Sequence, residues 1–118
     1  MNESHKLFRE ALDEVSTMAL ADKTKFLEAL LFYFTIAGRG IWSDDGPTDS
    51  DKLEAFKWLN ELLHRIWNIK YELSQSEDND SIGRLYGYMK FYSEQSSLLR
   101  QHLVPTVLGA FEIFKARQ

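Results

Sequence analysis

The twelve residues from Phe26 to Ala37 read FLEALLFYFTIA, and only Glu28 and Thr35 interrupt their apolar character. At about 100° per residue, Thr24, Glu28 and Thr35 fall on one narrow side of a helix whose remaining circumference is apolar. Such a helix needs partners around it, either other helices of this chain or a second copy. A bilayer-spanning helix needs about 20 apolar residues, so we expect a core helix and no membrane contact.

Helical periodicity continues on both sides of this segment. Apolar residues recur every three or four positions in three further segments: residues 3–20, 49–75 and 81–103. A short apolar run, residues 107–114, follows Pro105. The sequence therefore predicts an all-α, up-and-down bundle of four long helices plus a short C-terminal helix, with residues 1–118 forming one domain.

Three signals predict where these helices begin and end. The Gly-Arg-Gly run of residues 38–40 is expected to end the second helix, because glycine adopts the left-handed conformation common at helix C-termini. Thr48 or Asp49 is expected to start the third helix, which has acids in its first turn. Pro105 is expected to end or kink the fourth helix, since proline lacks the N–H that a helix interior uses.

Composition and charge exclude several classes of protein. The chain has no Cys, which rules out disulfides, thiolate metal sites and cysteine nucleophiles and favours a cytoplasmic location. No apolar run follows the N-terminal residues, so no signal peptide is expected. Residues 1–80 carry 16 acids and 9 bases, and residues 81–118 carry 2 acids and 5 bases. Nucleic-acid binding relies on clustered Lys and Arg, so no nucleic-acid partner is expected.

Two short motifs suggest metal ligands without completing a metal site. Glu61-Leu-Leu-His64 is a single Glu-x-x-His element, whereas di-metal sites in bundles use paired elements, and Glu61 should point away from the core. Asp44-Asp45-Gly46 suggests a calcium loop, but a loop starting at either Asp has no Gly at its sixth position and no Glu at its twelfth. We therefore expect no metal and no cofactor.

No catalytic set can be assembled from the sequence. A Ser or Thr nucleophile needs a positioned base, and the three His lie in different helical regions. Glu28 sits among apolar residues, so it is either the solvent-facing residue of its helix or a buried functional acid. These observations favour a protein that is not an enzyme.

Gly83 and Gly87 lie on one face of the predicted fourth helix. A glycine in a helix interior costs about 1 kcal/mol relative to Ala, so two of them on one face favour a specific reason. The close approach of another helix or subunit is one explanation, and poor helix formation near a frayed start is the other.

The strongest candidate binding site is the segment Arg39–Asp45, which reads Arg-Gly-Ile-Trp-Ser-Asp-Asp. It is expected to be a loop, yet it carries Trp and Arg, the side chains that occur most often at binding hot spots. In the alternative interpretation, Ile41 and Trp42 fold back and close the end of the bundle.

The leading functional hypothesis is a small, non-catalytic protein-binding module of the inhibitor, antitoxin-like or immunity-like kind. An acidic face speeds association with a basic partner. The expected contact residues are Arg39, Trp42, Asp44 and Asp45, with a second acidic patch at Glu77, Asp78 and Asp80.

Two alternatives stay open. The first is a homo-oligomer, such as a homodimer, that uses the second helix or the glycine face of the fourth. The second is a small-molecule binder or enzyme with an aromatic pocket between helices, lined by Trp58, Trp67 and Tyr33.

Overall fold

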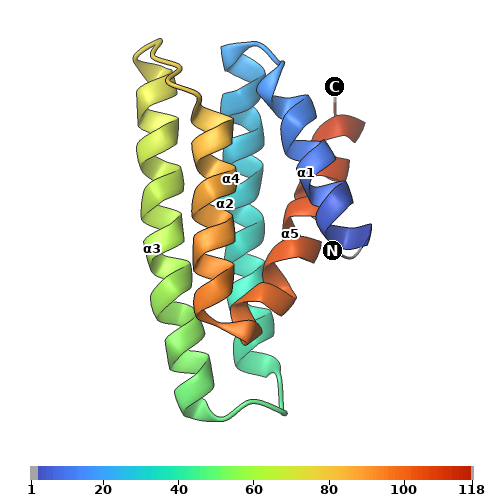
Figure 1. The fold of residues 1–118 in the computed structure, drawn as a ribbon, viewed down its shortest axis with the longest axis vertical. Helices are drawn as coiled ribbons and strands as arrows, with labels where there is room; N and C mark the ends of the chain where they lie inside the picture. Colours follow the sequence, from blue (N-terminus) through green and yellow to red (C-terminus); the bar gives the residue numbers. More distant parts are fainter. Residues whose placement is uncertain (1–2, 118) are drawn as a thin grey trace.

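Five α-helices make up the computed structural model, which describes residues 3–117, with side chains from Lys6 onward (Figure 1). They are α1 (Glu3–Ser16), α2 (Leu20–Ser43), α3 (Asp49–Ser74), α4 (Ser81–Gln95) and α5 (Ser97–Ala116). Successive helices run in opposite directions, which confirms the all-α, up-and-down bundle. Within these residues no helix combines the length and apolar content needed to cross a bilayer.

α2 is the helix around which the others are arranged. It packs against α1, α3 and α5, and α4 packs against the same three helices from across the core (Figure 1). Phe26, Leu30, Phe34 and Ile41 line the inner side of α2 and are at most 1 % exposed. Burying one such side chain contributes roughly 1.5–3 kcal/mol, so this row supplies much of the stability of the bundle.

The end of α2 differs from the sequence-based expectation. The helix does not stop at the Gly-Arg-Gly run but continues to Ser43, and neither Gly38 nor Gly40 has a positive φ. A Cβ added to Gly38 would lie 3.3 Å from a ring carbon of Phe56, and one added to Gly40 would lie 3.3 Å from Cε1 of His102. The two glycines therefore admit α3 and α5 close to α2, and they do not cap it.

The predicted fourth helix is in fact two helices. α4 ends at Gln95, and Ser96 starts α5: its backbone is extended, and its Oγ accepts a hydrogen bond from the Leu99 N–H at 3.1 Å. Pro105 does not end a helix, because it lies inside α5. Pro105 is exposed, so water can reach the carbonyl that its missing N–H leaves without a partner. The short C-terminal helix is thus the second half of α5.

The start of α3 agrees with the prediction. Thr48 is the N-cap, and its Oγ1 accepts a hydrogen bond from the Asp51 N–H at 3.1 Å. The Asp51 carboxylate in turn accepts a hydrogen bond from the Thr48 N–H at 3.3 Å. This reciprocal arrangement satisfies two backbone donors at the helix start.

The glycines of α4 are not explained by a neighbouring helix of this chain. A Cβ added to Gly87 would meet nothing within 4 Å, and one added to Gly83 would lie nearest the carboxylate of Asp80. We therefore expect Gly87→Ala to raise the free energy of unfolding by about 0.5–1 kcal/mol, because alanine favours the helix and restricts the unfolded chain. Thermal denaturation followed by circular dichroism measures this.

The matched control for Gly87→Ala is Gly38→Leu, whose side chain collides with Phe56 and Leu59. We expect this variant to unfold at a lower temperature than the wild type. If Gly87→Ala also destabilises the protein, the glycine face of α4 contacts a neighbour outside this chain.

Candidate functional site

The segment predicted as a binding loop is mostly helical. Arg39 to Ser43 form the last turns of α2, Asp44 is its C-cap residue and Asp45 begins the connection to α3. The fold-back interpretation holds for Ile41, which is fully buried, but not for Trp42, which is 49 % exposed. We name Arg39, Trp42, Asp44 and Asp45 the Trp42 corner.

Trp42 is held in place by two residues of α3. Its ring lies 5.1 Å from the ring of Phe56, and the two planes are tilted by 30°. The Lys52 ammonium donates a hydrogen bond to the backbone carbonyl of Trp42 at 3.0 Å and lies 6.0 Å from the centre of its ring. Half of the indole surface thus stays accessible in a fixed orientation, which lowers the entropy cost of binding a partner.

Asp44 connects the Trp42 corner to the rest of the fold. Its Oδ2 lies 3.9 Å from Nε2 of His102 on α5, and its Oδ1 accepts a hydrogen bond from the Gly46 N–H at 3.2 Å. Arg39 and Asp45 are exposed. The corner therefore presents one aromatic ring between charges of both signs.

The second predicted patch is at the opposite end of the bundle. The connection between α3 and α4, which holds Glu77, Asp78 and Asp80, lies beside the start of α2, and the Trp42 corner lies at its end (Figure 1). A helix of 24 residues is about 36 Å long, so the two predicted patches do not form one surface.

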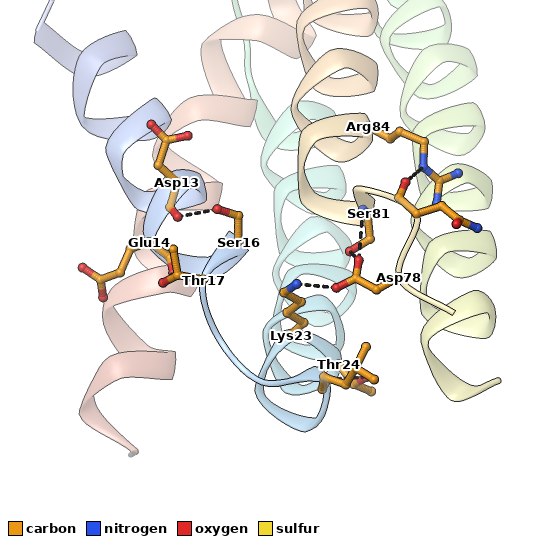
Figure 2. Close-up of polar contacts among 11 residues, drawn as sticks. Asp13, Glu14, Ser16, Thr17, Lys23, Thr24, Asp78, Ser81 and Arg84 are labelled. Atoms are coloured by element: carbon orange, nitrogen blue, oxygen red, sulfur yellow. Dashed lines mark hydrogen bonds and ion pairs between the residues drawn. The ribbon is translucent and has the colours of Figure 1, made fainter. Parts of the chain in front are cut away.

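Asp78 has a structural role that the sequence did not reveal. Its Oδ2 lies 2.5 Å from the Lys23 ammonium of α2, and its Oδ1 accepts hydrogen bonds from the Ser81 hydroxyl at 2.8 Å and the Ser81 N–H at 3.3 Å (Figure 2). The hydrogen bonds from Lys23 and Ser81 lower the pKa of Asp78 below its usual value. Asp78 therefore fastens the start of α4 to α2, and Asp80, the N-cap residue, makes no side-chain capping bond.

A groove between α2 and α5 has a volume of about 680 Å³. The groove is lined by Asp22, Lys25, Glu28, Ala29, Phe32 and Tyr33 of α2, by Ile113 and Phe114 of α5, and by Arg117, the C-cap residue of α5. Phe32 stands at its edge with 63 % of its surface exposed, and its ring packs edge-on against Tyr33 at 5.3 Å. We name this hollow the α2–α5 groove, which sequence analysis missed.

The outer side of α2 next to the groove is not covered by another helix. Phe32 is 63 % exposed and Ile36 is 47 % exposed, although both belong to the most apolar segment of the chain. Exposed charged residues lie on the same side of the helix, and Glu28 is one of them, so the solvent-facing interpretation of this acid is correct. We name the row Lys25, Glu28, Phe32, Ile36 and Arg39 the α2 stripe.

The aromatic pocket expected from Trp58, Trp67 and Tyr33 does not form. Trp58 packs against Tyr92 of α4, with 6.0 Å between ring centres, and Trp67 is 54 % exposed on α3. Tyr33 lies on α2, not α3, and lines the α2–α5 groove. Trp58 and Trp67 are nine residues apart, which places them on opposite sides of α3.

The two metal-like motifs lie on the surface. Glu61 and His64 are both exposed on α3. Among the residues that the structure describes, no group of three or more acids and His is close enough to hold a metal ion.

Comparisons with known proteins add no family. No protein-family model, curated protein or solved structure matches this chain significantly.

The Asp78–Lys23 pair predicts a specific dependence of stability on pH. A carboxyl whose pKa is lowered by folding adds stability above its ordinary value of 3.8, and this stability is lost as the pH falls through the lowered pKa. We expect Asp78→Asn to reduce the free energy of unfolding by about 1 kcal/mol near neutral pH, after allowance for solvent screening. Urea denaturation at about pH 6 and about pH 3 measures this.

The difference between the wild type and Asp78→Asn should shrink at the lower pH, because the stability that the charged carboxylate adds is lost as the pH falls toward its lowered pKa. Asp45→Asn is the matched control, since Asp45 is exposed and outside every ion pair found in the described residues. A difference that is the same at both pH values would show that Asp78 acts through its shape and not its charge.

Proposed function

We propose that this chain is a non-catalytic protein-binding module whose contact surface follows the outer side of α2, from the α2–α5 groove to the Trp42 corner. The observation that carries the proposal is the exposure of Phe32 and Ile36 at 63 % and 47 % on an uncovered helix face. Apolar residues grouped beside a groove and bordered by charges are typical of protein interaction sites.

The Trp42 corner supports the same proposal from the other end of α2. A half-exposed Trp, held by Phe56 and Lys52, has the properties of a hot-spot residue. Asp44 and Asp45 beside it favour a partner with basic residues, as does the net charge of −4. A small inhibitor, antitoxin-like or immunity-like protein of the cytoplasm is the class of module that we propose, with Glu77 and Asp80 as outlying acidic contacts.

Self-association is the second candidate, and one observation favours it. The α2 stripe carries Phe32 and Ile36 at its centre and charges of both signs toward its ends. A surface that carries both positive and negative charges can be complementary to itself in a symmetric dimer.

Substitution of the exposed apolar residues tests the proposal. Phe32→Ser combined with Ile36→Ser should abolish the capture of binding partners by the tagged protein, because it removes the apolar centre of the contact surface. Quantitative mass spectrometry of proteins captured from the source cells measures this. Trp42→Ala combined with Asp44→Ala should weaken capture of the same proteins.

The matched control is Leu53→Ser, since Leu53 is 61 % exposed on α3 and does not belong to α2. Circular dichroism should show all of these variants folded, because the substituted side chains are largely outside the core. If Leu53→Ser loses the partners that the α2 variant retains, the proposed surface is wrong.

A further inference from the structure

We propose that the occupant of the α2 stripe is the α2 stripe of a second copy of this chain, packed antiparallel about a two-fold axis between Phe32 and Ile36. This inference rests on the proposed contact surface and identifies what covers it. Three features of the stripe support it: its shape, the order of its charges and the lack of ion-pair partners for those charges between residues 6 and 117.

The stripe has the layout of an interface centre with a charged border. Phe32 and Ile36 are one helical turn apart and expose about half of their surface or more. The neighbouring sides of α2 are occupied, because α3 packs on one side and α5 on the other. In the view of Figure 1, α2 lies behind α4, with no helix drawn beyond it. A second helix can therefore reach this face without displacing any element of the fold.

The order of charges along the stripe is self-complementary. Glu28 lies six residues before the midpoint of Phe32 and Ile36, and Arg39 lies five residues after it. At about 1.5 Å per residue these positions are about 9 Å and about 7.5 Å from the midpoint. In an antiparallel pair, Glu28 of one copy therefore stands opposite Arg39 of the partner subunit, within about 1.5 Å along the helix axis.

The lateral positions agree with the axial ones. At about 100° per residue, Glu28 and Arg39 lie about 40° and about 20° from Phe32 in the same direction around the helix. A two-fold axis that passes between the two helices, perpendicular to both and in the plane of the interface, reverses the axial order but keeps the lateral side. The Glu28–Arg39 contact thus forms twice, once on each half of the interface, as an isologous dimer requires.

The charged groups of the stripe are free to make these contacts. No ion pair found between residues 6 and 117 involves Lys25, Glu28 or Arg39. Packed helices lie about 8–10 Å apart, a distance that Glu and Arg side chains can bridge. Lys25 faces the end of α2 of the partner subunit, where Asp45 is exposed and the helix dipole is negative. A partner unrelated to this chain would need the same charges in reverse order, which a second copy has by symmetry.

The pairing would engage Arg39 and Asp45 but leave Trp42 and Asp44 of each copy available. Because the two α2 helices run in opposite directions, their C-terminal ends lie at opposite ends of the interface. The dimer would therefore present two Trp42 side chains, about 25 Å apart along the helix direction at 1.5 Å per residue, to further protein partners.

Charge-reversal variants test this pairing. The wild-type protein should have a mass of about 28 kDa, twice the 13.8 kDa chain, in size exclusion with light scattering at high micromolar concentration. Glu28→Arg alone should place two Arg opposite each other, and Arg39→Glu alone should place two Glu opposite each other. Each change should raise the dimer dissociation constant by about tenfold or more.

An equimolar mixture of Glu28→Arg and Arg39→Glu should recover the dimer mass, because each copy then offers the charge that the other lacks. The double variant Glu28→Arg/Arg39→Glu should also dimerise. Since both residues are exposed, a loss of folding cannot imitate this pattern of loss and recovery. Leu53→Ser is the control and should remain dimeric.

A wild-type protein that remains a monomer overturns the self-pairing, and so does a dimer whose mass is unaffected by either single charge reversal. Neither result overturns the proposed function, which fails only if Phe32→Ser with Ile36→Ser retains every protein partner. If the wild type is a monomer and Phe32→Ser with Ile36→Ser loses a different captured protein, the α2 surface remains the proposed contact surface. Its occupant is then that protein and not a second copy.

Discussion

Phe26, Leu30, Phe34 and Ile41 form a row along the inner side of α2, and the core of the bundle closes around this row. Removing any of these side chains from water is favourable, but it requires that α1, α3 and α5 all lie against the same helix. Phe26 contacts Phe111 and Phe114 of α5 edge-on, at 6.3 and 5.7 Å between ring centres. Close packing against α2 therefore sets the orientation of each neighbouring helix and its distance from α2.

Close packing at α2 also explains features that have no local cause. Gly38 and Gly40 each cost helix stability, which is offset because Phe56 and His102 can approach without a side chain between them. At the other end of α2, the buried Lys23 reaches Asp78 across the chain and so holds the connection between α3 and α4. Both ends of α2 are therefore fixed by residues far away in sequence, and the helix acts as the rigid support for the Trp42 corner.

α2 has more apolar surface than its own chain covers. Three neighbouring helices and the core take up the inner side and the flanks, and Phe32 and Ile36 remain on the outside. The two exposed apolar residues beside a groove of about 680 Å³ are the basis of the proposed contact surface. In the proposed contact, the charges that border these residues would select the partner, since like charges facing each other disfavour a wrong pairing.

The sequence alone determined the helical class, the up-and-down order and the start of α3 at Thr48, because periodicity and capping depend on residues within a few positions of one another. It misplaced the end of α2 and the break at Ser96, and it did not reveal that Asp78 pairs with Lys23. The sequence indicated that α2 is apolar around nearly its whole circumference, but it did not indicate which side stays exposed to solvent. Only the tertiary structure decided these points, because a glycine, an acid or an aromatic residue acquires its role from neighbours such as Phe56 or Lys23, which folding alone brings into contact.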